Sequence, residues 1–166
     1  MSDVVSSDGF KDVLRHFPSG VTIVTIWANG ERHGLTVSAF ASISPSPPLI
    51  MVAIDKKHRA HEMLMADDAV FAVNVLAADQ DKLSNRFAWV KEDRFAEGDW
   101  MTAVTGAPIL ADALGWLDCT IFARHDSGTH TIFVGEVKGS AVPRPEELPL
   151  VYWNRGYRAL NVESES

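Results

Sequence analysis

A segment rich in β-branched residues is followed directly by an Asn-Gly turn, and this pair is the strongest indication of a β-hairpin in the sequence. Residues 21–27 read Val-Thr-Ile-Val-Thr-Ile-Trp, a composition that favours extended backbone. Asn29-Gly30 follows, and this dipeptide is a strong local signal for a tight hairpin. We therefore expect a strand at 21–27, a turn at 28–31 and a second strand over about 33–41.

The rest of the sequence alternates short strands with short helices. The apolar residues Phe10, Val13, Leu14 and Phe17 recur at helical spacing, which predicts a helix over 10–17 that ends at Pro18. The Pro-rich residues 44–48 end the second strand. Further strands are expected at 49–54, 70–76, 114–124, 131–142 and 150–153.

Two further helices are expected at 58–66 and 79–88, the second with an acidic cap at Asp79. Residues 90–112 are expected to be irregular, and 126–128 to form the turn of a long closing hairpin. Strands outnumber helices, and most successive strands are joined by hairpin-length turns. The pattern therefore indicates a mainly β fold with flanking helices, an antiparallel barrel with the helices packed outside.

Length and composition fit one globular domain spanning 1–166, with its core at about 10–160. The chain has 166 residues, of which 46% are hydrophobic and 22% charged. The net charge of −7 argues against a nucleic-acid partner, which requires basic patches. The start of the chain lacks a basic and apolar leader, and no apolar run reaches the ~20 residues of a membrane span. We therefore expect a cytoplasmic protein that does not associate with membranes.

Several familiar catalytic signatures are missing from the sequence. It contains no G-x-S-x-G elbow, Walker loop, G-x-G-x-x-G turn or Cys-x-x-Cys pair. The single cysteine, Cys119, stands in a strand-like context and is expected to be a buried thiol. These absences remove the usual support for a serine hydrolase, a P-loop enzyme, a Rossmann dehydrogenase or a zinc finger.

Two local features could carry chemistry. Lys56, Lys57 and Arg59 lie together between an apolar strand and a helix, where a phosphate could bind; a solvated basic turn is the alternative. His58 and His61 have metal-ligand spacing, but no third ligand stands out, so no metal is expected. Residues 34–44 alternate small or hydroxyl residues with apolar ones, which suits either a flat ligand against the backbone or an ordinary strand with a polar face.

Taken in order, several segments resemble the short-chain flavin reductases, the reductase components of two-component flavin monooxygenases. The resemblance runs from about residue 10 to 160. It is carried by 17–25 (Phe-Pro-Ser-Gly-Val-Thr-Ile-Val-Thr), 34–49, 71–76, Gln80, 83–88, 106–110, 117–119, 130–137, 149–152 and Tyr157. The resemblance implies the FMN-binding split β-barrel fold.

The resemblance also implies roles for particular residues. The strand bearing Thr36, Val37, Ser38, Ala39 and Ser42 should lie along the isoalloxazine and ribityl chain. The remaining implied residues are Lys57, His58 and Arg59 near the flavin phosphate, Asn74 and Arg86 near the cofactor, and His130 and Tyr157 at the nicotinamide. His130 is the candidate catalytic residue, as a positioning group first and a proton donor second; a histidine that merely satisfies its hairpin is the alternative.

The implied activity is reduction of FMN or FAD by NADH or NADPH. The implied partners are a second copy in a homodimer and a separate flavin-dependent monooxygenase that receives reduced flavin. The sequence departs from the family where many relatives have Ser or Thr in the phosphate turn and Gly-Asp-His before the late strand. The alternatives are another split-barrel oxidoreductase, a non-catalytic flavin-binding module, or a purely structural dimerisation domain.

Overall fold

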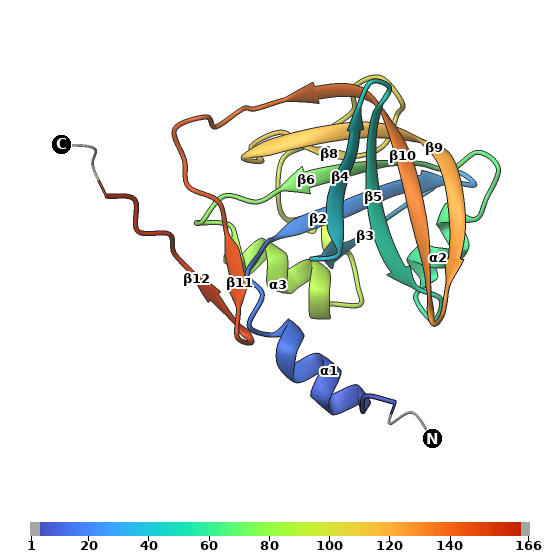
Figure 1. Cartoon of the computed structure of the whole chain (residues 1–166). Coiled ribbons are helices and arrows are strands. Elements are labelled where there is room, and N and C mark those ends of the chain that lie inside the picture. Colours follow the sequence, from blue (N-terminus) through green and yellow to red (C-terminus); the bar gives the residue numbers. More distant parts are fainter. Residues whose placement is uncertain (1–3, 164–166) are drawn as a thin grey trace.

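The computed structural model describes residues 4–163 as a curled β-sheet with three α-helices around it (Figure 1). The helices are α1 (Ser7–Leu14), α2 (Arg59–Leu64) and α3 (Asp81–Trp89), with a 3₁₀ turn η1 (Arg94–Ala96). The strands are β1 (Ser19–Gly20), β2 (Thr22–Ala28), β3 (Glu31–Val37), β4 (Phe40–Pro45), β5 (Pro48–Asp55), β6 (Val70–Val75), β7 (Trp100–Met101), β8 (Ile109–Leu110), β9 (Gly115–Ser127), β10 (His130–Ala141), β11 (Val151–Trp153) and β12 (Gly156–Arg158).

Seven strands form one antiparallel sheet in the order β3-β2-β6-β9-β10-β5-β4. The two edge strands, β3 and β4, are consecutive in sequence and are joined only by Ser38 and Ala39. The sheet must therefore curl until its edges meet at this junction, although β3 and β4 do not pair. The result is a barrel that stays split along one seam (Figure 1).

The single second strand predicted over 33–41 is wrong. The chain leaves β3 at Val37, turns at Ser38 through a bond from the Phe40 N–H to the Ser38 carbonyl (2.9 Å), and enters β4 on the opposite edge. An alternation of apolar and polar residues carries no signal for this exchange of edges, because both strands have the same period.

Strand β2 is buried on both faces, which fits its sequence of β-branched and apolar residues. Val24 and Ile26 face the barrel interior, where the short helix α2 adds Met63 and Leu64 to the same core. Ile23 faces the other way, into a second cluster beneath α3.

Glycine at position 34 is what lets α3 come close to the barrel. A Cβ there would lie 2.6 Å from the Phe87 ring, closer than real atoms approach. The contact between Gly34 and Phe87 therefore sets the distance between α3 and β3. This distance also affects the width of the cleft beside the end of α3.

Most predicted elements are confirmed, with shifted boundaries. The Asn29-Gly30 turn has positive φ at both residues, as a tight hairpin requires. The closing hairpin turns at Gly128-Thr129 instead of 126–128, because Gly128 is the residue with positive φ. The predicted cap at Asp79 is wrong: α3 begins at Asp81, and Asp79 pairs with Arg144 (2.8 Å). The short strands β1, β7, β8 and β12 were not predicted.

Cys119 is buried, as predicted, and burial raises the pKa of its thiol to about 12. Within residues 4–163, no helix is long and apolar enough to cross a membrane. No group of three or more His, Cys, Asp or Glu side chains in that range is arranged to hold a metal ion.

Candidate functional site

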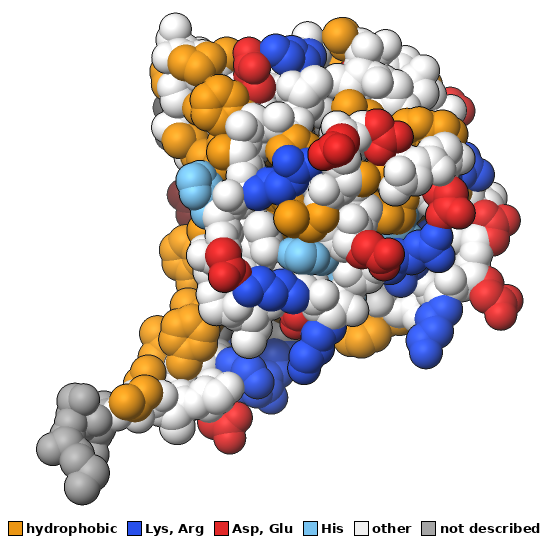
Figure 2. Space-filling view, turned by 90° about the vertical axis from the view of Figure 1, so that its right-hand side faces the viewer, with side chains coloured by type: hydrophobic (Ala, Val, Ile, Leu, Met, Phe, Trp, Pro, Cys, Tyr) orange, Lys and Arg blue, Asp and Glu red, His pale blue; other side chains and the backbone are white. Residues whose placement is uncertain are grey.

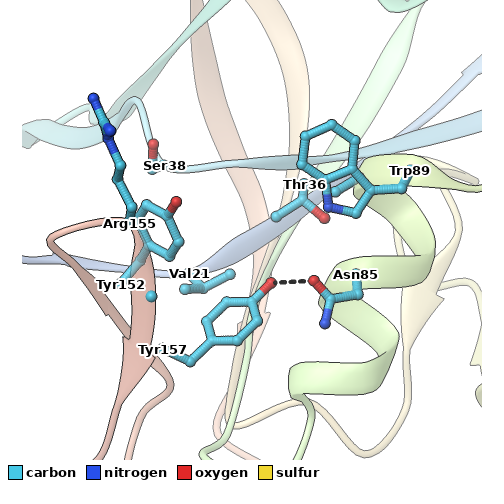
Figure 3. A pocket seen from close by; sticks show the side chains of 10 residues that line it. Val21, Thr36, Ser38, Asn85, Trp89, Tyr152, Arg155 and Tyr157 are labelled. Carbon is cyan, nitrogen blue, oxygen red and sulfur yellow. Dashed lines mark hydrogen bonds between the residues drawn. The ribbon is translucent and has the colours of Figure 1, made fainter. Parts of the chain in front are cut away.

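A cleft of about 390 Å³ lies between α3 and the β11–β12 hairpin, beside the end of β3 (Figure 3). Its walls carry aromatic rings and small polar groups, a composition typical of sites for ring-shaped ligands. The lining residues are Val21, Thr36, Ser38, Asn85, Ala88, Trp89, Tyr152, Arg155, Gly156 and Tyr157. Thr36, Ser38 and Tyr157, three of the residues implied by the resemblance, therefore meet in one place.

Hydrogen bonds to one turn of α3 hold the walls of this cleft together. The Thr36 hydroxyl donates to the Ser84 carbonyl (2.6 Å), and the Tyr157 hydroxyl lies 2.8 Å from the Ser84 Oγ and 3.1 Å from the Asn85 Oδ1. Figure 3 shows Tyr157 and Asn85 pointing toward one another across the floor. The Asn85 Nδ2 donates to no other residue of the described chain, so it is available to a ligand.

A second cleft of about 480 Å³ adjoins the first and shares Ser38 and Tyr152 with it. Its other walls are mostly apolar and come from the N-terminal segment and the β4–β5 face: Leu14, Arg15, Phe17, Ser19, Ala39, Phe40, Ala41 and Met51. The two clefts together offer room for two ring systems that meet at the β3–β4 junction.

The backbone of the junction presents unused donors. The carbonyls of Ser38 and Ala39 accept bonds from Phe40 and Ala53 (2.9 and 3.0 Å), but neither N–H of Ser38 and Ala39 donates to any residue in 4–163. Two N–H groups without an acceptor in the described chain thus lie at the seam where the sheet edges meet. Such donors suit the polar edge of a flat ring that carries carbonyl oxygens and nitrogens.

The predicted phosphate turn, Lys57 to Arg59, lies between the end of β5 at Asp55 and the start of α2. Lys56 pairs with Asp126, and Arg59 pairs with Glu31. Lys57 forms no ion pair with any described residue and lines an open cleft with Arg59. Of the three cations, Lys57 is therefore the one most available to a phosphate.

Asp55 fixes the shape of this turn. Its carboxylate accepts the Lys57 N–H (2.9 Å), and this hydrogen bond lowers the pKa of Asp55. His58 occupies the N-cap of α2 without a side-chain capping bond. Because α2 is only six residues long, its dipole contributes little, and the charge of Lys57 carries most of the attraction for an anion.

Two residues expected near the cofactor have their polar groups bonded within the fold. Asn74 is fully buried: its amide donates to the Ile23 carbonyl (3.0 Å) and accepts from the Leu110 N–H (2.8 Å), so it joins β2, β6 and β8. Arg86 turns away from the cleft and donates to the carbonyls of Arg94 (3.0 Å) and Asp93 (2.6 Å). Both side chains use their polar groups to stabilise the fold.

Three other predicted residues lie outside the cleft that holds Thr36. Val37 is buried in the barrel, and Ser42 is exposed on β4 opposite Ile50. His130 begins β10 on the face opposite to the buried Thr131, directly across from Asp55, with its Nδ1 2.9 Å from the Thr129 hydroxyl. Its proposed nicotinamide role therefore stays a prediction.

The sequence did not point to Asn85, Trp89, Tyr152 or Arg155 as cleft residues. Trp89 is 79% exposed, an unusual position for a large aromatic side chain, but exposure is not visible in a single sequence. Tyr152 and Arg155 belong to the β11–β12 hairpin, and its second strand was not predicted. Their place beside α3 follows only from the packing of that hairpin.

The family model described as "Flavin reductase like domain" matches residues 14–161. The chain belongs to this family. The resemblance stated from the sequence and the split-barrel class of fold are thereby confirmed.

Individual relatives agree with the family. A flavin reductase (NADH) from Kitasatospora aureofaciens is 39% identical, over 98% of this chain and 86% of that protein. The reductase subunit HsaB of a flavin-dependent monooxygenase from Mycobacterium tuberculosis is 32% identical, over 98% of this chain and 87% of that protein.

A solved structure shares the fold over nearly the whole chain. The NADH:FAD oxidoreductase SgcE6 of Streptomyces globisporus C-1027, solved in complex with NAD and FAD fragments, superposes with a TM-score of 0.89 at 33% identity. The match covers 99% of this chain and 100% of that one.

Proposed function

We propose that this chain is an NAD(P)H:flavin oxidoreductase that reduces FMN or FAD. The observation that carries the proposal is the cleft at the β3–β4 junction, where unused backbone donors lie beside aromatic and polar walls in a member of the flavin reductase family. The activity requires one pocket that admits two planar rings, and the two adjoining clefts supply that space.

The residues present fit a flavin. The N–H groups of Ser38 and Ala39 and the free amide of Asn85 match the polar edge of an isoalloxazine, and the exposed rings of Trp89 and Tyr152 offer flat apolar faces. The junction lies beside Ala53, and β5 continues from there for two residues, about 7 Å, to its end at Asp55. Lys57 follows two residues after Asp55. An extended five-carbon ribityl chain would run along this stretch of β5, toward a phosphate near Lys57.

When bound, the flavin supplies the hydride-accepting chemistry, which no side chain of the protein can supply. The chain's own part would be to hold the reduced nicotinamide against the ring. The N–H dipoles of Ser38 and Ala39 would stabilise negative charge on the edge of a bound ring. No side-chain acid or base is required for this step, which leaves His130 a positioning role.

We further propose that the protein acts as a homodimer. Helix α1 buries none of its residues within the protomer. Its apolar side chains Phe10, Val13 and Leu14 are each more than half exposed. Figure 2 shows hydrophobic side chains uncovered along the lower left of the molecule. An exposed apolar face of this kind is typical of a protein–protein interface, and a second copy is the partner that the family resemblance implies.

We also propose that a separate monooxygenase component receives the reduced flavin. Support comes from relatives that are named as reductase subunits of flavin-dependent monooxygenases. Reduced nicotinamides are cytoplasmic metabolites, so the cytoplasm is the proposed location.

The proposal is tested by following NADH and NADPH oxidation with FMN, FAD and riboflavin side by side. Catalytic consumption of the nicotinamide that depends on added flavin is the expected result. Flavin binding without nicotinamide consumption would instead identify a binding module, and no flavin binding would identify a structural domain.

A matched pair of lysine variants tests the phosphate seat in the same assay. Lys57→Ala is expected to raise the KM for FMN about 5-fold while leaving riboflavin, which lacks the phosphate, unchanged. Lys82→Ala, at an exposed position on α3, makes the same charge change away from the turn and is expected to change neither. An equal loss with riboflavin would show that Lys57 acts on the fold and not on the phosphate.

A further inference from the structure

The turn between β11 and β12 holds an arginine in a conformation that favours glycine. Asn154 and Arg155 form the two central residues, with φ of +48° and +62°. The β2–β3 hairpin of the same chain makes the same kind of turn with Asn29 and Gly30, at φ of +53° and +76°. Residues other than glycine are disfavoured at positive φ. Arg155 nevertheless occupies the turn position that Gly30 has in the β2–β3 hairpin.

Arg155 stands in the wall of the candidate site. It lines the cleft together with Tyr152, Gly156 and Tyr157 of the same hairpin. In Figure 3 it rises on the Ser38 side, across the cleft from Asn85 and Trp89. Throughout residues 4–163, no carboxylate pairs with its guanidinium and no acceptor binds it. A chain with a net charge of −7 thus places an uncompensated cation at the mouth of its cleft.

We propose that Arg155 is a specificity-determining residue that binds the diphosphate bridge of the nicotinamide dinucleotide. The planar fork of a guanidinium fits two phosphate oxygens at once, and a two-residue turn leaves its base little freedom. A reduced nicotinamide ring that enters the cleft would carry its diphosphate toward the rim, where Arg155 lies. This inference rests on the proposed reductase function.

The position of Arg155 favours the nicotinamide nucleotide over the flavin as the source of this phosphate. The Lys57 turn follows β5 and lines a different cleft, with Asn29 and Glu31 at the opposite end of β3. A flavin whose phosphate lies at Lys57 has no second phosphate to offer at Arg155 if it is FMN. With FMN as the flavin, a phosphate bound at Arg155 therefore belongs to the second substrate.

The test uses Arg155→Gly, which removes the side chain and creates the Asn-Gly turn already present in β2–β3. Because glycine relaxes the backbone there, the melting temperature should not fall. Binding is measured by quenching of tryptophan fluorescence with NAD⁺, ADP-ribose and FMN, and with nicotinamide riboside, which lacks the diphosphate. We expect the Kd to rise about 5- to 30-fold for NAD⁺ and ADP-ribose. The Kd for FMN and nicotinamide riboside should stay within about 2-fold of wild type, a change below ~0.5 kcal/mol.

Two further variants separate charge from structure. Arg155→Lys keeps the charge without the fork and should lose less affinity for NAD⁺ than Arg155→Gly. Arg158→Ala removes a cation from the same hairpin, where Arg158 packs over Trp153 (5.7 Å) away from the cleft lining, and should leave all four affinities unchanged.

An unchanged NAD⁺ affinity in Arg155→Gly, in a wild-type protein that does oxidise NADH with added flavin, would overturn this inference alone. An equal loss for FMN would assign Arg155 to the flavin phosphate and would also overturn it. A wild-type protein that neither binds NAD⁺ nor consumes NADH would overturn the proposed function itself.

Discussion

His33 is a histidine held among positive charges. It lies on the edge strand β3, about half-buried, with Arg94, Arg59 and His58 nearby. Burial and, next, the charge of Arg94 lower the pKa of His33 from 6.5 to about 4. The side chain is therefore neutral in the folded protein at pH 5–7, where an unfolded chain would already begin to protonate it.

This shift predicts a loss of stability in mild acid. Between pH 6.5 and 4 the unfolded chain binds the proton and the folded chain does not, so the contribution of His33 is complete above about 6.5 and falls as the pH drops toward 4. Allowing for its partial exposure, we expect a loss of about 1–2 kcal/mol. Urea unfolding of wild type and His33→Gln at pH 7 and pH 4.5 measures it. Parallel losses in the two proteins would contradict the prediction, because other titrating groups cancel in the comparison.

His130 lies across from Asp55 and has its Nδ1 2.9 Å from Thr129 Oγ1. If it positions the nicotinamide, His130→Ala should raise the KM for NADH about 5-fold and change flavin affinity much less, because one hydrogen bond to the second substrate is lost. His125→Ala, on the other strand of the same hairpin and exposed, is the matched control. Steady-state kinetics with both substrates varied would show an unchanged KM for NADH if His130 only forms hydrogen bonds within its own hairpin.

At the scale of elements, local signals predicted most strands and helices, and packing decided the rest. The Asn29-Gly30 turn and the β-branched run of β2 are local properties, and both were predictable. The break at Ser38-Ala39 was not, because only closure of the barrel places β3 and β4 on opposite edges. Asn74 was expected near the cofactor through the family resemblance alone, and the sequence does not show whether the partners of such a residue are a ligand or the core.

Helix α1 yields a prediction about assembly. A helix of eight residues is marginal alone, even with the Ser6 cap to the Gly9 N–H (3.0 Å), and α1 buries nothing within its protomer. We expect the wild-type protein to be a dimer and Leu14→Asp, which puts a charge on the apolar face, to be mainly monomeric at micromolar concentration. Lys11→Ala, on the same helix, should remain dimeric. Light scattering after size-exclusion chromatography gives the masses, and a monomeric wild type would refute the homodimer.

At the scale of the whole molecule, the site is assembled from parts that are far apart in the sequence. Thr36 and Ser38 come from the β3–β4 seam, Asn85 from α3, and Tyr157 from the β11–β12 hairpin. The residues of the seam and Tyr157 were identifiable through the family resemblance, because they belong to ordered sequence blocks. Asn85 and Arg155 face the cleft only because Gly34 admits α3 and because the hairpin packs beside it.

The charge of the whole molecule sets up the last prediction. The net charge of −7 repels a dianionic FMN phosphate at long range, while Lys57 attracts it at contact distance. Raising the ionic strength from about 0.01 to 0.1 M shortens the screening length from about 30 to 10 Å, which weakens both effects. If the local attraction dominates, FMN affinity of the wild type falls with salt. Lys57→Ala removes the attraction and leaves the protein one unit more negative, so its weaker FMN affinity should stay level or rise with salt. Fluorescence titrations with FMN, and with uncharged riboflavin as the salt-insensitive control, distinguish the two. The same salt response in both proteins would show that the flavin phosphate lies elsewhere than at the Lys57 turn.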